Sequence, residues 1–199
     1  IFTTADGEIP LDELSKLTSG ADILAPDPTN IGGFEKAKPV LTKIMESLPN
    51  LKGVCLSTTS FGWVDLDYCK KHNLPVSNIP GYSRESVAEH ALALMLCAAK
   101  KIILSDRRTR QGKYKMEMGT ELKGKTLGVI GLGNIGGRVA ALGKAVGMKV
   151  IAYNRTPKIV DGVEMKTFDE VLQQSDVISL NTTHEDTNKE MIGSVQLGK

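Results

Sequence analysis

The sequence has no excess of charge of either sign. Its 199 residues include 25 Lys and Arg against 23 Asp and Glu, a formal net charge of +2, and 41% of them are hydrophobic. Such a chain has enough apolar side chains to build a core, and it lacks the charge density of a disordered segment or a nucleic-acid-binding tail. Composition therefore predicts a globular protein of one large or two small domains.

Cysteines are few, and long hydrophobic runs are absent. Cys55, Cys69 and Cys97 are an odd number, and their spacing matches no zinc site. A chain of this length needs no disulfides, so we expect a reducing, cytoplasmic location and no metal. The longest apolar run, residues 91–99, is far shorter than the ~20 residues of a membrane helix. We therefore expect no membrane partner.

Aromatic residues make up only 5% of the chain, which matters for its most basic stretch, residues 100–125. Nine Lys and Arg against three Asp and Glu there could form a phosphate-binding or nucleic-acid-binding patch, or a solvated helix end and loop. Tyr114 is the single aromatic side chain in this stretch, so base stacking has little support. The solvated surface is favoured, and no nucleic-acid partner is expected.

Short β-branched runs alternate with helical patterns in the first part of the chain. Strands are predicted at residues 22–25, 53–57 and 75–78, with helices at 40–48 and 66–72 between them. This alternation is typical of parallel βαβ units, so the predicted fold class is α/β with a parallel sheet.

A Pro-Gly break at residues 80–81 separates this layer from a long helical pattern. Residues 86–89 have the form of a capping box and predict that a helix begins there and continues to residue 104. Its apolar positions cover more than one face, which predicts burial on several sides, as between two domains.

A glycine fingerprint is the strongest signal in the chain. The apolar strand 126–130 leads into Gly131, Gly133 and Gly136, and a helical pattern and a second strand at 149–153 follow. This context is that of a dinucleotide-binding βαβ unit of ~30 residues. Gly131 would permit the tight turn, Gly133 the approach of a pyrophosphate and Gly136 close helix packing, while the helix N-terminus offers N–H donors.

The second strand of this unit ends in Asn154, Arg155 and Thr156. An NAD site usually places Asp or Glu at this point, where it would repel a 2′-phosphate. Asn is neutral and Arg offers a planar set of donors, so NADP is favoured as cofactor and NAD is possible. The alternative is that Arg155 is a solvated turn residue and Asn154 binds a ribose hydroxyl of NAD.

A further capping box at residues 167–170 predicts a short helix, and residues 176–180 read as the third strand of one βαβαβ half. Ligands lie beyond the carboxyl ends of such strands, so the residues after this strand are expected to line the site. These residues are Asn181, Thr182, Thr183 and His184. Only nineteen residues follow residue 180, too few for a second half.

Four motifs occur in an order that resembles the D-isomer-specific 2-hydroxyacid dehydrogenases. They are residues 53–67, NIPGYS with SVAEH at 78–90, GKTLGVIGLGNIG at 124–136, and SDVISL at 175–180 followed by MIG at 191–193. The resemblance implies a flavodoxin-like substrate domain at residues 1–83. It also implies a Rossmann dinucleotide-binding domain at 84–199, truncated after its first βαβαβ half.

The resemblance also implies roles for individual residues. The loop at residues 60–62 would hold a substrate carboxylate through backbone N–H groups, with Phe61 and Gly62 at the substrate. Where the family commonly has Val-Pro, this chain has Thr182 and Thr183. Besides the three glycines, the implied cofactor-binding residues are Val87, Asn134, Ile135, Asn154, Arg155, Thr156, Thr182, Thr183 and Asn188.

The family's catalytic Arg, Glu and His would lie beyond Lys199, so no catalytic residue is assigned. None of His72, His90 and His184 occupies the corresponding position. The resemblance implies a homodimeric NAD(P)-dependent oxidoreductase that acts on a small 2-oxo or 2-hydroxy acid, with glyoxylate or hydroxypyruvate favoured. The alternative is a non-catalytic, dinucleotide-sensing protein like the co-repressor member of the family.

Overall fold

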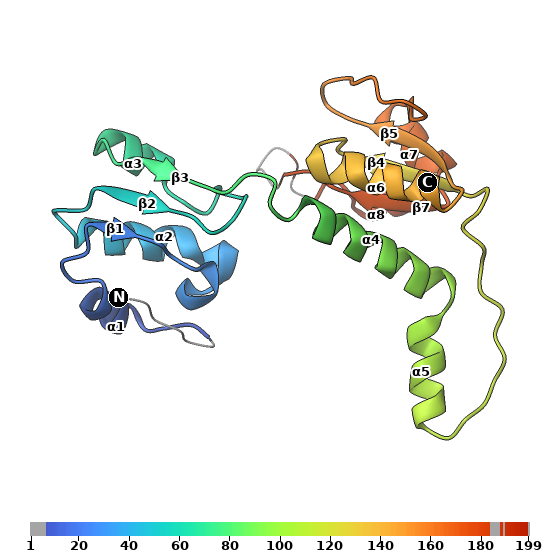
Figure 1. Ribbon diagram of the computed structural model, residues 1–199, viewed down its shortest axis with the longest axis horizontal. Helices are drawn as coiled ribbons and strands as arrows, with labels where there is room; N and C mark the ends of the chain where they lie inside the picture. The colour runs from blue at the N-terminus through green and yellow to red at the C-terminus, as the bar shows by residue number, and fades with distance from the viewer. Residues whose placement is uncertain (1–6, 184–187, 189, 199) are drawn as a thin grey trace. The chain divides into compact units, whose positions relative to one another are not determined.

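The chain folds into two compact units, Ile1–Tyr82 and Ser83–Lys199 (Figure 1). The structure is a computed structural model and describes residues 7–183, 188 and 190–198. Each unit has its own parallel sheet and its own hydrophobic core. The predicted α/β class with parallel sheets is therefore confirmed. No helix in the described ranges is long and apolar enough to cross a membrane.

The first unit is built on a three-stranded parallel sheet in the order β1-β2-β3. Apolar side chains of α2 pack against this sheet, and Leu41, Ile44 and Val54 are almost completely buried. The elements of the unit are α1 (Leu11–Leu17), β1 (Ile23–Leu24), the 3-10 helix η1 (Pro28–Ile31), α2 (Gly33–Glu46), β2 (Gly53–Cys55), α3 (Leu66–Lys71) and β3 (Val76–Ser77).

The second unit is built on a four-stranded parallel sheet in the order β6-β5-β4-β7. In the central strand β4, the side chains of Leu127, Val129 and Ile130 are completely buried. The elements are α4 (Arg84–Ala99), α5 (Ile102–Arg110), β4 (Thr126–Ile130), α6 (Asn134–Ala145), β5 (Lys149–Tyr153), β6 (Glu164–Met165), α7 (Phe168–Gln174), β7 (Val177–Leu180) and α8 (Ser194–Leu197).

The strand predicted at residues 176–180 exists as β7, but it is the fourth strand of the second unit along the chain and not the third, because β6 precedes it. It pairs with β4 on the side away from β5, and the strand beyond β5 is the two-residue β6. The prediction missed β6 because two residues carry no periodic pattern. The sheet is therefore not confined to one βαβαβ half. The strand order reverses at β4, because β5 and β6 lie on one side of it and β7 lies on the other, and such a switch point is where α/β sheets bind ligands.

The long helix predicted from residue 86 to 104 is also corrected. It begins at Arg84, and the Ser86 hydroxyl donates to the Ser83 carbonyl at 3.0 Å, so no capping box forms at 86–89. Lys101 has a φ of 54°, which ends α4 and starts the separate helix α5. In α4, Ala88 and Met95 are buried and His90 is exposed, and the burial of this helix between two domains stays a prediction.

The capping box predicted at residues 167–170 is confirmed. The backbone N–H of Thr167 donates to the Glu170 carboxylate at 2.8 Å, and the backbone N–H of Glu170 donates to the Thr167 hydroxyl at 3.3 Å. These bonds satisfy two N–H groups that a helix start leaves without partners, and they fix the beginning of α7 beside the sheet.

An ion pair joins α4 to α6 at the start of the second unit. Arg138 Nε lies 2.5 Å from a Glu85 carboxylate oxygen, and Arg84 approaches the other oxygen at 2.8 Å. The bond from Arg138 is the main cause of a Glu85 pKa below its ordinary value. Ionised Glu85 therefore stabilises the folded chain above the ordinary glutamate pKa of about 4.3, and this contribution is lost as pH falls through the lower folded pKa.

We predict that Arg138→Met raises the pKa of Glu85 toward its ordinary value, as measured by an NMR titration of the Glu85 carboxyl carbon. The melting temperatures of the variant and the wild type should differ at pH 7 and converge near pH 3. Arg84→Met is the matched control and should shift the pKa less, because the Arg138 bond remains. An unchanged Glu85 pKa in Arg138→Met would contradict this assignment.

Candidate dinucleotide-binding site

In the glycine-rich turn at the end of β4, two of the three glycines have no room for a side chain. Gly131 has a φ of 91°, and a Cβ there would stand 2.7 Å from the Asn181 carbonyl oxygen at the end of β7. A Cβ on Gly136 would stand 2.0 Å from the Gly131 carbonyl oxygen. The close approach of β4, β7 and α6 therefore requires glycine at both positions, whether or not a ligand binds.

Gly133 differs from these two glycines. It is exposed, and a Cβ built on it would meet no protein atom within 4 Å. Gly133 is also the N-cap of the twelve-residue helix α6, with no side-chain cap bond. The first N–H groups of a helix have no partner within the helix, and they attract anions. Open space beside these donors fits a diphosphate group at Gly133.

A cleft of about 750 Å³ opens beside this turn, at the carboxyl ends of the strands of the second unit. It gathers eight of the twelve predicted cofactor-binding residues from three separate segments of the chain. The lining residues are Gly131, Gly133, Tyr153, Asn154, Arg155, Thr156, Lys158, Asn181, Thr182, Thr183, Asn188 and Met191.

Four predicted cofactor-binding residues do not line this cleft. Asn134 and Ile135 are the first two residues of α6, and Gly136 is buried against the Gly131 carbonyl. Val87 lies in the first turn of α4 and is 42% exposed. The roles of these four residues toward a cofactor stay predictions.

The corner after β5 is hydrogen-bonded to the backbone of Leu132 in the glycine turn. The Leu132 N–H donates to Asn154 Oδ1 at 2.8 Å, and Lys158 Nζ donates to the Leu132 carbonyl at 3.2 Å. Asn154 Nδ2 donates to the Thr156 carbonyl at 2.6 Å. Both polar groups of Asn154 therefore act within the protein in this structure, bracing the corner that carries Arg155.

The described residues that line the cleft include two cations, Arg155 and Lys158, and no carboxylate. This charge favours an anionic ligand. Lys158, Tyr153 and Met191 are lining residues that the sequence did not single out. The position of Lys158 three residues after Arg155, in the same corner, is the one signal that could have indicated it.

The segment after β7 forms the other side of the cleft. The Asn181 N–H donates to the Ile130 carbonyl at 2.8 Å, which continues the β4–β7 pairing by one residue. Asn188 Nδ2 donates to the Thr183 carbonyl at 2.5 Å, and the Thr182 hydroxyl lies 3.8 Å from the Met191 sulfur. These contacts hold Asn188 and Met191 beside Thr182 and Thr183. His184, also predicted to line the site, lies outside the described residues.

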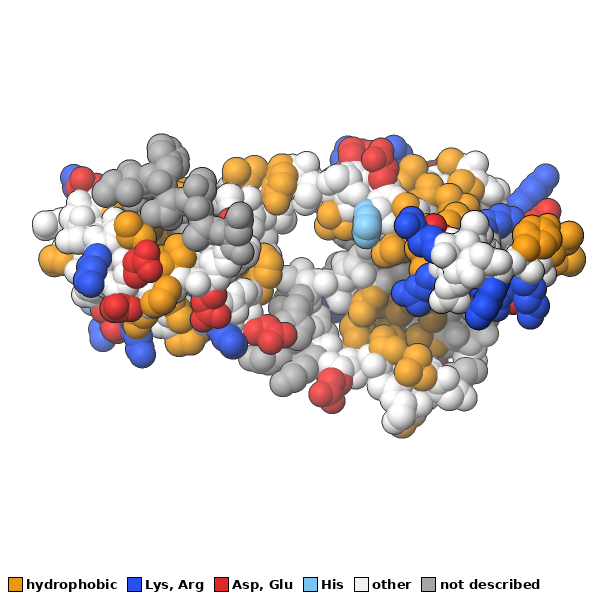
Figure 2. All heavy atoms as spheres, turned by 90° about the horizontal axis from the view of Figure 1, so that it is seen from below, with side chains coloured by type: hydrophobic (Ala, Val, Ile, Leu, Met, Phe, Trp, Pro, Cys, Tyr) orange, Lys and Arg blue, Asp and Glu red, His pale blue; other side chains and the backbone are white. Residues whose placement is uncertain are grey.

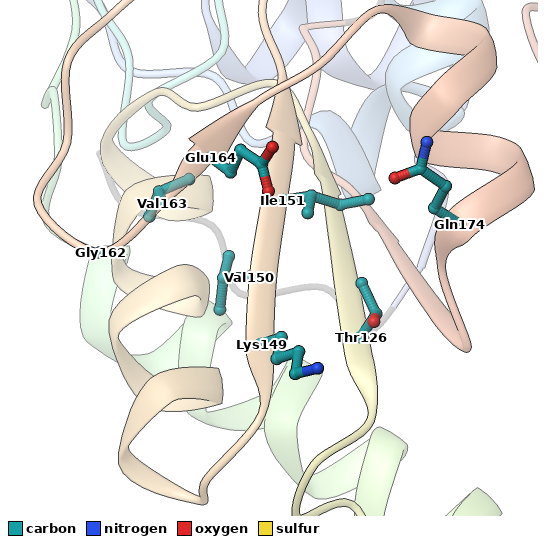
Figure 3. A pocket seen from close by; sticks show the side chains of 8 residues that line it. All are labelled: Thr126, Lys149, Val150, Ile151, Gly162, Val163, Glu164 and Gln174. Atoms are coloured by element: carbon teal, nitrogen blue, oxygen red, sulfur yellow. The ribbon is translucent and has the colours of Figure 1, made fainter.

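A second hollow of about 710 Å³ lies over β5 and β6 (Figure 3). Thr126 and Lys149, the first residues of β4 and β5, line it, so it lies toward the amino ends of those strands. None of the predicted site residues lines it. Within the described part of the chain, no group of three or more His, Cys, Asp or Glu side chains is arranged to hold a metal ion.

The predicted substrate loop, residues 60–62, lies in the first unit between β2 and α3. Two of its carbonyl groups accept hydrogen bonds: the Trp63 indole N–H donates to the Ser60 carbonyl at 2.9 Å, and the Val64 N–H donates to the Phe61 carbonyl at 3.0 Å. No described residue accepts a hydrogen bond from the N–H groups of Ser60, Phe61 or Gly62, which are all exposed. Several free N–H groups on one exposed loop can bind a carboxylate.

Comparison with known proteins places this geometry in a family. The profile described as "D-isomer specific 2-hydroxyacid dehydrogenase, NAD binding domain" matches residues 92–199, more than half of the chain. The chain belongs to this family. The resemblance read from its motifs is therefore confirmed.

Relatives in the D-isomer specific 2-hydroxyacid dehydrogenase family include a glyoxylate reductase of Aeropyrum pernix and a hydroxypyruvate reductase of Thermotoga maritima. The first is 32% identical over 77% of this chain and 50% of its own length. The second is 35% identical over 94% of this chain and 60% of its own length. The chain thus spans half to three fifths of the length of these relatives.

Solved structures of similar fold carry either coenzyme. A D-lactate dehydrogenase of Aquifex aeolicus, complexed with NAD and lactic acid, is 34% identical, with a TM-score of 0.79 over 96% of this chain and 55% of its own. An acyclic imino acid reductase in complex with NADPH and D-Arg is 28% identical, with a TM-score of 0.78 over 95% of this chain and 60% of its own.

We predict that Gly133→Ala weakens binding of NAD and NADP at least tenfold and leaves the melting temperature within about 2 °C of wild type. The added methyl group meets no protein atom and would occupy the space of the diphosphate. Isothermal titration calorimetry of the chain with each coenzyme measures the affinity, and circular dichroism measures the melting temperature.

Gly137→Ala is the matched control, because Gly137 is one helical turn further along α6 and its Cβ would also meet nothing within 4 Å. Alanine in a helix interior is favoured by about 1 kcal/mol over glycine, so this variant should be slightly more stable and bind as wild type does. If Gly133→Ala and Gly137→Ala bind the coenzymes with equal affinity, the diphosphate does not lie at Gly133.

Proposed function

We propose that this chain forms the cofactor-binding part and some of the substrate-binding part of an NAD(P)-dependent oxidoreductase. The enzyme would transfer a hydride between the nicotinamide and a small 2-oxo or 2-hydroxy acid. The observation that carries the proposal is the open space at Gly133, beside the free N–H groups at the start of α6, in a chain of this dehydrogenase family. When bound, the nicotinamide supplies the hydride chemistry.

The two units have separate tasks in this proposal. Residues 1–83 hold the substrate, and the exposed N–H groups of Phe61 and Gly62 bind its carboxylate. Residues 84–199 hold the dinucleotide, with the diphosphate at the start of α6 and the adenosine end at Arg155 and Thr156. The residues that transfer the proton are not assigned in this chain.

We propose glyoxylate or hydroxypyruvate as the 2-oxo acid. The names of two relatives support this choice, because one is a glyoxylate reductase and the other a hydroxypyruvate reductase. A further support is the Asn154-Arg155-Thr156 corner, which resembles that of NADP-using reductases of these acids.

NADP is the proposed cofactor, with NAD as a weaker ligand. Arg155 and Lys158 give the adenosine side of the cleft positive charge, and Asn154 stands where a carboxylate would repel a 2′-phosphate. The free Cys55, Cys69 and Cys97 are compatible with the cytoplasmic location that we propose.

We also propose a homodimer formed through α4, α5 and the segment after them. The side chains of Tyr114, Met116 and Met118 are 90%, 78% and 86% exposed. Between the two methionines, Glu117 forms an ion pair with Arg108 at 2.5 Å. Figure 2, which views the molecule from below, shows hydrophobic side chains among Lys and Arg side chains on the second unit. A second copy would cover this apolar surface, and sedimentation equilibrium measures whether the protein is dimeric or monomeric.

The test of the proposed function is turnover by the full-length gene product that contains this chain. We expect oxidation of NADPH, followed at 340 nm, with glyoxylate or hydroxypyruvate and little with acids that lack a 2-oxo group. Tight binding of NADPH without turnover of any short 2-oxo acid would instead indicate a dinucleotide sensor.

Arg155→Ala should weaken NADP binding about tenfold to hundredfold, because a hydrogen bond to a charged group contributes about 1.5–3 kcal/mol. NAD binding should change less than threefold, since NAD lacks the 2′-phosphate. Calorimetric affinities for both coenzymes give the ratio, and Arg107→Ala on the exposed surface of α5 controls for the loss of one positive charge. An unchanged ratio in Arg155→Ala would show that Arg155 does not select the coenzyme.

A further inference from the structure

Lys158 is the second cation of the dinucleotide cleft, and no motif of the chain accounts for it. It lies after β5 in the same corner as Arg155, and both side chains line the same cleft. Its Nζ donates one hydrogen bond, at 3.2 Å, to the carbonyl of Leu132 within the glycine turn. An ammonium group carries three N–H donors, so two remain for a ligand in the cleft.

The hydrogen bond to Leu132 brings the Lys158 ammonium group to the rim of the glycine turn. A long, flexible lysine side chain on a surface loop would otherwise sample many rotamers, and ordering it on binding costs free energy. Here the Leu132 carbonyl already orders it beside the cleft. Asn154 accepts from the N–H of the same Leu132 and donates to the carbonyl of Thr156. The first bond joins the corner to the glycine turn, and the second lies within the corner.

We propose that Lys158 is a specificity-determining residue that binds the 2′-phosphate of NADP together with Arg155. This inference rests on the proposed function. The 2′-phosphate carries close to two negative charges at neutral pH and three acceptor oxygens, so it can accept from a guanidinium and an ammonium group at once. The described lining of the cleft supplies these two cations and no carboxylate to oppose them.

Two adenine nucleotides separate this role from a purely structural one. Adenosine 2′,5′-bisphosphate carries the 2′-phosphate, whereas ADP carries the diphosphate alone. If Lys158 contacts the 2′-phosphate, its loss weakens only the first ligand. If Lys158 acts only as a brace on Leu132, its loss disturbs the glycine turn and weakens both ligands equally.

The experiment is isothermal titration calorimetry of the chain with each nucleotide, for wild type, Lys158→Met, Lys158→Arg and the control Lys149→Met. Lys158→Met should bind adenosine 2′,5′-bisphosphate about tenfold to hundredfold more weakly and ADP within twofold of wild type. Lys158→Arg should retain the preference. Lys149 lines the hollow at the amino ends of the strands, so its variant tests the loss of charge alone and should bind both nucleotides as wild type does.

The outcomes distinguish this inference from the proposed function. Equal weakening of both ligands in Lys158→Met, or no change in either, overturns the role of Lys158 while coenzyme binding by the cleft stands. If Lys149→Met loses as much affinity for adenosine 2′,5′-bisphosphate as Lys158→Met does, the effect comes from net charge alone, and this result also overturns the role of Lys158. If wild type binds neither nucleotide, the proposed function and this inference fall together.

Discussion

The second unit depends on one close contact, where β4 ends and three backbone segments meet. The carbonyl of Gly131 lies against the first turn of α6 at Gly136, and Gly131 itself lies against the end of β7 at Asn181. Any side chain at Gly131 or Gly136 would force these segments apart. Because they stay together, Gly133, the N-cap of α6, lines the same cleft as the loops after β5 and β7. The position of the cleft is thus a consequence of backbone packing.

Leu132 transmits that packing to the adenosine side of the cleft. Asn154 accepts from its N–H, which ties the glycine turn to the corner that carries Arg155, and its carbonyl accepts from the Lys158 ammonium group. The amide of Asn154 is well suited to this, since it accepts from one backbone group and donates to another, whereas a carboxylate can only accept. The charge at the corner and the geometry of the turn are therefore set by the same few bonds.

The features that depend on local chemistry could be predicted from the sequence. Those that depend on contacts with distant segments, or that have no sequence pattern, could not. The glycine turn and the Thr167–Glu170 capping box follow from steric and hydrogen-bonding rules within a few residues, and the structure has both. The position of β7 beside β4 depends on strand pairing, which the apolar run of β7 does not encode. The break at Lys101 has no Gly or Pro to mark it, and Lys158 lies in a loop without periodicity, so neither could be found from a pattern.

The unequal lengths of the strands also determine where the second sheet is weakest. β4 pairs with β5 through all five of its residues and with β7 through four of them, whereas β6 pairs through only two residues. Local opening begins where backbone hydrogen bonds are few, so amide hydrogens at the β6 edge exchange with solvent long before those of β4. Such fraying starts at the far side of the sheet from the β4–β7 pair. The glycine turn therefore extends from the most slowly exchanging strand, and its donors keep their spacing while the edge opens and closes.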